Sequence, residues 1–450
     1  MSRLLARSRE LLLLLFATGL LALMLFGLET SQGRTLSTEM LYIIGGFIGV
    51  YAIAHVAIAF LAPYADQVML PVVALLNAIG LVVIYRLDLA ERPLYGPLAE
   101  RQMLWSLVGV GLMVLTLIVI RDHKSLSRYS YLLGLVGLIL LALPLVWPQP
   151  PGYEEARIWL WLGPFSIQPG EFSKILLLIF FAQLLAQKRA LFTVAGKRFL
   201  GLTFPRLRDL APILMVWAIA ILIMAVSNDF GPALLLFATV LGMVYFATGR
   251  ASWLAIGFAL VAVGGYAVYQ VSSKIQDRVA NFIDPFADFE GTGNQPANAL
   301  MGLSWGGITG TGLGYGHPEL VPVAHSDYIL AALGEELGFV GIAAVLCLFG
   351  VFITRGFRTA MQVRDSYGKL LASGLALTIA IQIFVVAGGV SAMLPMTGLT
   401  TPFMSAGGSS VMANYILLGL LLRISNSANR PVDYDAVAAG TAKPEVVGTR

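Results

Sequence analysis

The chain has 450 residues, a formal net charge of +4, 58% hydrophobic residues and only 12% charged residues. Because soluble domains carry about 25% charged residues, this composition excludes an ordinary soluble protein. The apolar runs repeatedly reach the roughly 20 residues that a helix needs to cross a bilayer, and they lack the alternation of a spanning β-barrel. The single cysteine, Cys347, lies inside one of these runs, so no intramolecular disulfide can form.

We therefore expect an all-α polytopic membrane protein with about 12 transmembrane helices. The predicted spans cover residues 10–28, 41–62, 68–85, 102–120, 130–147, 172–187, 209–227, 231–248, 253–271, 328–354, 369–393 and 406–424. The first span follows three arginines and has no small-residue cleavage site, which indicates an anchor rather than a removed signal peptide. After Ser425 the sequence is polar and aperiodic, which predicts a disordered tail.

Basic residues mark one side of the membrane. One set of connecting loops holds most of them: Arg121, Lys124, Arg128, Lys188, Arg189, Lys197, Arg198, Arg206, Arg208, Arg355, Arg358 and Arg364. The opposite loops hold fewer: Arg34, Arg86, Arg92, Arg101, Arg157, Lys274 and Arg278. Since cytoplasmic loops are enriched in Lys and Arg, we expect both termini in the cytoplasm and the opposite loops outside.

Three outer loops, at residues 148–171, 272–326 and 391–410, are unusual. The first and third are rich in Pro and Gly, and the second is too long for a mere connector. Irregular backbone of this kind is tolerated at membrane depth only inside protein or beside a wet cavity. We expect these loops to be structured.

The segment at 325–338, HSDYILAALGEELG, places three carboxylates at the mouth of an apolar span and within it. These are Asp327, Glu335 and Glu336. Ionisable groups in a span are costly, and they persist where they face protein or water and carry a function. The alternative is that Asp327 caps the helix and the glutamates match the helix dipole.

Three segments together resemble the SEDS family of shape, elongation, division and sporulation proteins, whose best-known branches are RodA and FtsW. In the first segment, Gln168-Pro169-Gly170-Glu171 and Lys174 stand where the family has Gln-Pro-Ser-Glu and Lys. The second carries GGITGTGLGYG at 306–316, then HSDYILAALGEELGFVG at 325–341. The third is PMTGLTTPFMSAGGSS at 395–410. The similarity covers residues 68–424, and the RodA branch is favoured.

The resemblance implies a glycosyltransferase membrane domain at 65–424, with a ten-helix core. An additional helix pair at 1–64 would precede it, and a disordered cytoplasmic tail at 425–450 would follow. It implies a peptidoglycan glycosyltransferase of the bacterial cytoplasmic membrane that polymerises lipid II on the outer face. The implied partners are lipid II with the growing glycan strand, a class B penicillin-binding protein as transpeptidase, and membrane lipid. No nucleic-acid partner is expected. The family's essential aspartate falls on Asp327.

Joining two sugars requires a base for the acceptor hydroxyl, and a carboxylate in hydrogen-bond reach can serve. Asp327 is the predicted general base, and His325 is the second choice because a histidine there is more often structural. Glu335 and Glu336 are supporting residues. The predicted substrate-binding residues are Glu171, Lys174, Gln168, Trp159, Arg157, His325, Ser405 and Ser409.

The charge of the lipid pyrophosphate has to be met by cations or a metal. Lys174 and Arg157 are the first candidates, with Lys274 and Arg278 behind them. Glu171 and Lys174 are three residues apart on one helix face, so the alternative is that they only pair with each other. Mg²⁺ or Mn²⁺ held by clustered carboxylates is a further alternative, although no fixed ligand spacing supports it.

Other conspicuous residues have simpler readings. Asp229 is predicted to cap the following helix, and Asp284 and Asp288 are predicted to be solvated loop acids. The glycines at 306–316 are predicted to form turns, since the strand-to-helix setting of a nucleotide fingerprint is missing. Trp159 and Trp161 fit an interfacial aromatic belt, with stacking on sugar as the alternative.

Two other functions stay open. A transporter that flips lipid-linked precursor usually shows internal repeats, broken helices and a polar site near the midplane. No repeat is visible here, but Glu335 and Glu336, about two turns into the span, keep this alternative. The third possibility is a non-catalytic scaffold for the transpeptidase.

Overall fold

The computed structural model describes residues 4, 6–34, 37–90, 96–150, 157–163, 165–193, 198–199, 202–203 and 207–431, without the side chains of 189–214. Every predicted span contains a helix: α2 (Ser8–Ser31), α3 (Thr38–Leu61), α4 (Met69–Asp88), α5 (Leu98–Val119), α7 (Ser130–Val146), α8 (Pro169–Thr193), α9 (Leu207–Val226), α10 (Phe230–Thr248), α11 (Ser252–Val271), α14 (Ile329–Gln362), α15 (Ser366–Val390) and α16 (Gly408–Asn429).

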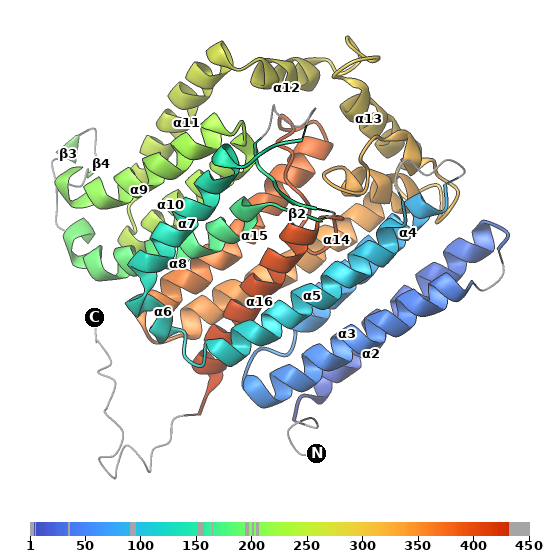
Figure 1. Ribbon diagram of the computed structural model, residues 1–450, viewed down its shortest axis with the longest axis horizontal. Helices are drawn as coiled ribbons and strands as arrows, with labels where there is room; N and C mark the ends of the chain where they lie inside the picture. Colours follow the sequence, from blue (N-terminus) through green and yellow to red (C-terminus); the bar gives the residue numbers. More distant parts are fainter. Residues whose placement is uncertain are drawn as a thin grey trace.

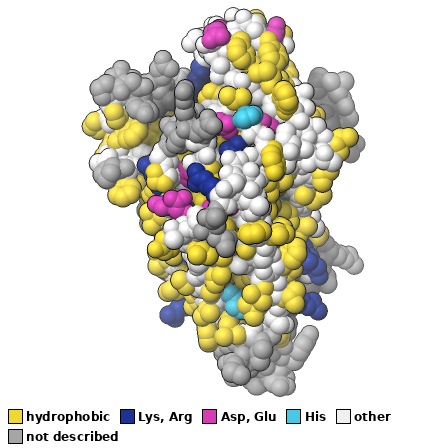
Figure 2. Space-filling model, turned by 90° about the vertical axis from the view of Figure 1, so that its right-hand side faces the viewer, with side chains coloured by type: hydrophobic (Ala, Val, Ile, Leu, Met, Phe, Trp, Pro, Cys, Tyr) yellow, Lys and Arg dark blue, Asp and Glu magenta, His cyan; other side chains and the backbone are white. Residues whose placement is uncertain are grey.

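Length and composition support membrane crossing. Within the described residues, 10 helices are long and apolar enough to span a bilayer, while Ser130–Val146 and Met215–Val226 are shorter apolar helices. Hydrophobic side chains cover much of the face in Figure 2, and the acidic side chains that it shows lie at the top and near the middle. The prediction of an all-α polytopic membrane fold is confirmed.

Two helices form the centre of the bundle. In α4 and α16, 89% of an apolar 18-residue stretch is buried, against 6% in α11. Around them α5 packs on α16, α7 on α8, and α14 on α15. The start of α2 and the end of α16 lie at the lower side of the bundle, and the segment between α11 and α14 arches over the upper side (Figure 1).

The outer loops contain structure that the hydropathy pattern does not predict. The long loop folds into α12 (Ser273–Ile283), α13 (Asn294–Gly306) and the 3₁₀ helix η1 (Pro318–Leu320). The first outer loop contains an antiparallel hairpin, β1 (Leu160–Leu162) with β2 (Phe165–Ile167), in which Leu160 faces Ile167. The remaining elements are the short helix α6 (Lys124–Arg128) and the hairpin of β3 (Arg198–Phe199) with β4 (Leu202–Thr203). The expectation that the outer loops are structured is confirmed for their described parts.

Helix α14 is broken at Gly338, which has φ +66° and ψ −169°. We call residues 306–316 the glycine segment. It packs into the break: the amides of Phe339 and Val340 donate to the carbonyls of Gly307 (2.9 Å) and Ile308 (3.1 Å). In return the amides of Thr311 and Gly312 donate to the carbonyls of Glu335 and Glu336. The predicted span at 328–354 is present, and it contains this break, which its hydropathy does not reveal.

The glycines of this segment do form turns, as predicted. Gly307, Gly310, Gly312 and Gly314 all have positive φ, a region that other residues rarely adopt. At the other end of the chain, α16 continues to Asn429, so residues 425–429 of the predicted tail are helical. Residues 432–450 of that tail lie outside the described residues.

Substituting Gly338 tests the break in α14. Its backbone lies in a region open almost only to glycine, where another residue costs roughly 1–3 kcal/mol. A Cβ would also collide with the backbone of Gly310 and Ile308. We expect Gly338→Ala to lower the melting temperature of the purified protein clearly. Gly350→Ala is the matched control, since it lies in the same helix with open space around its Cα. Equal melting temperatures for the two variants would contradict the described break.

Candidate functional site

A cavity of about 250 Å³ opens beside α12 and the start of α14. Asp327 and Tyr328 form one part of its wall, and the loop after α15 forms another. The remaining lining residues come mainly from α12 and the chain that follows it: Lys274, Asp277, Arg278, Asn281, Phe282, Thr292, Gln295, Pro296 and Leu300. Of the predicted catalytic and substrate-binding residues, only Asp327 lines this cavity, together with Lys274 and Arg278, the second-choice cations for the pyrophosphate.

Asp327 lies two residues before the first residue of α14. The N-cap position is occupied by Tyr328, without a side-chain capping bond, so the alternative in which Asp327 caps the helix is not what the structure contains. Burial raises the pKa of Asp327 above its ordinary value, while its own backbone amide and the nearby Arg278 act in the opposite direction. The carboxylate is therefore a stronger base than a solvated aspartate, and a cation stands beside it.

One face of α12 supplies the cations of the cavity. Arg278 donates from Nη1 to the carbonyl of Thr397 (3.1 Å), and Lys274 donates to the carbonyl of Asn228 (3.2 Å). Gly398, with φ +75°, allows the loop after α15 to pass closely. A Cβ there would lie 3.1 Å from Arg278 Nη2 and 4.0 Å from Asp327 Oδ2. The guanidinium, the carboxylate and this loop thus meet at one point.

Asp229 joins this group, contrary to its predicted role. It occupies the N-cap position of α10, but its side chain makes no capping hydrogen bond. Burial raises its pKa to about 6, and Glu171 adds to that shift, while Lys274 and Arg278 oppose it. The capping prediction was wrong, and Asp229 is a partly buried carboxyl within the electrostatic reach of both cavity cations.

Glu171 and Lys174 form a buried ion pair of 2.6 Å in the first turns of α8. This geometry fits the alternative in which the two residues satisfy each other, and neither lines the cavity. Gln168 acts through its backbone, whose amide donates to Ser409 Oγ (2.8 Å). The first outer loop is thereby joined to the start of α16.

Ser405 holds the segment that carries Asp327. Its hydroxyl donates to the carbonyl of Ser326 (2.5 Å) and accepts from the amide of Thr401 (2.8 Å). The next amide, that of Ala406, donates to the carbonyl of His325 (2.8 Å). Ser405 and Ser409, predicted as substrate-binding residues, therefore make bonds within the protein that fix the outer loops to one another.

His325 faces a different space from Asp327. It lines a small cavity of about 20 Å³ together with Asp88 and Glu319. Burial lowers its pKa to about 4, so the imidazole is neutral at physiological pH and a weak base. Asp327 is the better placed of the two candidates.

Glu335 and Glu336 secure the glycine segment. Glu336 pairs with Arg86 Nε (2.8 Å), and Arg86 Nη2 donates to the carbonyl of Gly316 (2.7 Å). Glu335 accepts from the amide of His317 (2.6 Å). All three charged side chains are buried. Arg86 was predicted for an outer loop but lies inside α4. From there it joins Glu336 of α14 to Gly316 of the glycine segment.

The residues of the first outer loop lie apart from the cavity. Trp159 accepts at its carbonyl from Gln149 (3.2 Å), and Trp161 donates to the same side chain (3.2 Å). Arg157 is exposed and approaches the carbonyl of Leu145 at 3.5 Å. These residues cover the outer end of α7. Asp284 and Asp288 are exposed and accept local backbone bonds, as predicted.

The cavity contains Asp277 and Asn281, which the sequence did not single out, beside Lys274 and Arg278, which it placed second among the candidate cations. Lys274, Asp277, Arg278 and Asn281 follow one another at spacings of three, one and three, which places them on one face of a helix. This pattern was available in the sequence, but the segment was read as loop. Within the described ranges no group of three His, Cys, Asp or Glu side chains lies close enough to hold a metal ion.

Known proteins resemble the chain over most of its length. A family model for FtsW, RodA and SpoVE, described as cell cycle protein, matches residues 66–430. The peptidoglycan glycosyltransferase RodA of Mycobacterium tuberculosis is 49% identical over 430 residues, which cover 95% of this chain and 92% of that one.

Solved structures share the fold. A chain in a study of structural coordination of polymerization and crosslinking by a peptidoglycan synthase complex is 26% identical with a TM-score of 0.64. It covers 82% of this chain, and 99% of its own length is matched. The rod shape determining protein RodA of Thermus thermophilus is 25% identical with a TM-score of 0.58, over 82% of this chain and 98% of that one.

The raised pKa of Asp229 predicts a pH-dependent effect on stability. The folded protein binds this proton more tightly than the unfolded chain. Its stabilising contribution is therefore complete below the unfolded pKa and is lost as pH rises through about 6. Asp229→Asn removes the ionisation. The melting temperature of this variant, relative to that of the wild type, should therefore increase as the pH is raised from about 4.5 to about 7.5. Asp284→Asn, an exposed control, should show a constant difference. A constant difference for Asp229→Asn as well would refute the buried carboxyl.

Proposed function

Since the chain belongs to the family of FtsW, RodA and SpoVE proteins and is a peptidoglycan glycosyltransferase, we propose that it polymerises lipid II into glycan strands. The reaction takes place at the outer face of the bacterial cytoplasmic membrane, which the protein crosses several times. One observation carries the proposal: Asp327 shares a cavity of about 250 Å³ with Lys274 and Arg278. A base and two cations are what transfer from a lipid pyrophosphate requires.

Asp327 acts as the general base. The acceptor hydroxyl gives its proton to the carboxylate while its oxygen bonds to the anomeric carbon of the donor. The bond from that carbon to the pyrophosphate oxygen breaks, and the lipid pyrophosphate leaves with the electron pair. A positioned base contributes about 10²–10⁴-fold. Burial favours this role because it raises the pKa of the carboxyl. A single displacement converts the α-linked donor into a β-linked product.

Lys274 and Arg278 bind the pyrophosphate. Both line the cavity, and both come from the same helix face. Fixed cations aimed at developing negative charge stabilise the transition state without reorganisation, and a guanidinium matches phosphate oxygens with two parallel bonds. Lys174 is less suited to this role, because it is already paired with Glu171.

A metal ion has little support from the described residues. The described side chains include no cluster of three metal-ligating groups, and the charges that act on Asp229 are those of Glu171, Lys274 and Arg278. We therefore assign the pyrophosphate charge to the two cations and route no step through a metal. Assistance by Mg²⁺ or Mn²⁺ stays a prediction.

The surroundings of the enzyme follow from the same proposal. Both termini lie in the cytoplasm, in agreement with the basic residues of the loops on that side, and the Asp327 cavity opens outside. A class B penicillin-binding protein is the proposed partner, because glycan strands made here have to be crosslinked. The core at 65–424 would carry both the reaction and this contact.

The break in α14 is the one observation that favours a flippase, since transporters often bind substrate at broken helices. Here, however, the polar groups beside the break are already engaged. Glu336 is paired with Arg86, and Glu335 accepts from the amide of His317. The break is thus better explained by packing of the glycine segment than by a transport site.

The aspartate substitution separates the three functions. In purified protein supplied with labelled lipid II, we expect Asp327→Asn to lower polymerisation at least about 100-fold, because the amide cannot accept the proton. The variant should still insert and purify. Asp284→Asn, in the same outer loop but exposed, should retain wild-type polymerisation.

The other outcomes identify the alternatives. Near-wild-type polymerisation by Asp327→Asn would exclude this carboxylate as the base. Exchange of labelled lipid II across vesicle membranes without any polymer would support the flippase. Intact cell-wall synthesis in cells that carry only the Asp327→Asn protein would support the scaffold.

A further inference from the structure

The two N-terminal helices lie outside the part of the chain that the family model matches, which begins at residue 66. We call α2 and α3 the N-terminal pair. Helix α2 packs on α4, and α3 packs on α5, along one side of the bundle (Figure 1). Both ends of the pair make polar contacts with the matched region, and the outer contact reaches the glycine segment.

At the outer end, the last turn of α2 lies directly against Gly314. Gln32 donates from its side chain to the carbonyl of Gly314. A Cβ at position 314 would collide with Ser31 Oγ and would lie 3.2 Å from Leu28 Cδ1. This close approach requires glycine, whose φ here is +84°. The glycine segment is therefore in contact with the N-terminal pair on one side and with α14 on the other.

A second contact runs through α4. Glu29 is buried and accepts from the hydroxyls of Ser37 and Tyr85, the latter at 2.6 Å. The residue after Tyr85 is Arg86, which binds the carbonyl of Gly316 and the carboxylate of Glu336. In the outer turn of α4, Tyr85 is thus bound by Glu29, and the next residue, Arg86, binds the glycine segment.

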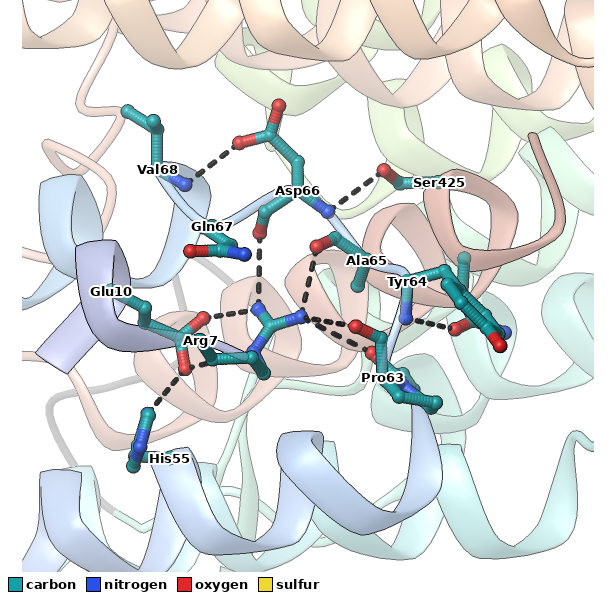
Figure 3. A network of polar contacts seen from close by, with 12 residues as sticks. Arg7, Glu10, His55, Pro63, Tyr64, Ala65, Asp66, Gln67, Val68 and Ser425 are labelled. Carbon is teal, nitrogen blue, oxygen red and sulfur yellow. Dashed lines mark hydrogen bonds and ion pairs between the residues drawn. The ribbon is translucent and has the colours of Figure 1, made fainter. Parts of the chain in front are cut away.

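At the inner end, a buried charge holds the start of α2 against the turn before α4. Figure 3 shows Arg7 with Glu10 on one side and backbone carbonyls of the turn before α4 on the other. The guanidinium donates to the carbonyls of Ala65 (2.9 Å) and Asp66 (3.4 Å), and Glu10 contacts His55 Nδ1 of α3 at 2.6 Å. Breaking such contacts would leave charges without partners in a dry environment. The pair is therefore fixed at both ends.

We propose that the N-terminal pair positions the segment that carries Asp327, through the glycine segment. Gln32 and Glu29 are its positioning residues. The glycine segment ends 11 residues before Asp327, and its amides bind carbonyls of Glu335 and Glu336, eight and nine residues after it. Asp327 is bracketed between these attachments. Loosening the glycine segment therefore loosens the backbone on both sides of the base. The inference rests on the proposed function where activity is the readout.

The test compares two variants with a matched control. Gln32→Glu replaces the donor by an acceptor that faces a carbonyl, and Tyr85→Phe removes the hydroxyl that binds Glu29. Thr30→Ala is the control, because Thr30 lies in the same turn of α2 and is exposed, and its hydroxyl donates to the carbonyl of Phe26 in its own helix. All are made in the full chain and measured in lipid nanodiscs.

We expect faster amide hydrogen exchange at residues 306–317 in both variants and unchanged exchange in the control. With lipid II as substrate, kcat should fall about 3- to 10-fold, the effect of one hydrogen bond, while KM stays within about twofold. If the pair had only a structural role, the variants would give less active protein, but amide hydrogen exchange at residues 306–317 would not become faster. Unchanged exchange at 306–317, or an unchanged kcat, overturns the inference. Absence of polymerisation in the wild type would instead contradict the proposed function. Amide hydrogen exchange at residues 306–317 would still test whether the N-terminal pair holds the glycine segment.

Discussion

The ion pair between Arg86 of α4 and Glu336 of α14 is the interaction on which the outer half of the molecule depends. Both side chains are buried, and a charge in that environment is costly unless it is paired and hydrogen-bonded. Because Arg86 also binds Gly316, the pair holds three segments at once: a central helix, the first half of a broken helix and the glycine segment between them. The position at which α14 begins, and hence the position of Asp327, follows from this contact.

The cost of burying an unpaired charge also distinguishes the charges that hold the structure from those available for catalysis. Charges that hold the structure, such as Glu171 with Lys174 or Arg7 with Glu10, are buried and close to a partner of opposite sign. Arg278 and Asp327 are also of opposite sign and close to each other, but both line a cavity beside Gly398, where a substrate can reach them. Asp229 lies within the influence of the same cations, which explains why burial alone does not set its pKa. The cavity therefore has both signs of charge available for a ligand.

Hydropathy predicted the helices well, because a span must satisfy its own backbone and therefore needs a long apolar run. It missed the break at Gly338, which depends on hydrogen bonds from a segment about 30 residues earlier, and it missed α12, whose apolar and charged residues alternate with helical periodicity within a segment read as loop. For the site, the sequence indicated the motif around Asp327 and named Lys274 and Arg278 as second-choice cations, but it did not show which residues contact one another. Ser405, predicted to bind substrate, bonds to the carbonyl of Ser326, and Asp229, predicted to cap a helix, makes no capping bond and lies within electrostatic reach of Lys274. Such pairings come from tertiary contacts that spacing does not encode.

The most direct measurement is a structure of the Asp327→Asn protein with lipid II bound. The account predicts a pyrophosphate within about 3 Å of the Lys274 and Arg278 side chains, with the anomeric carbon turned toward residue 327 and room beside it for an acceptor sugar. A pyrophosphate bound elsewhere on the bundle, or a sugar separated from residue 327 by protein, would contradict the account.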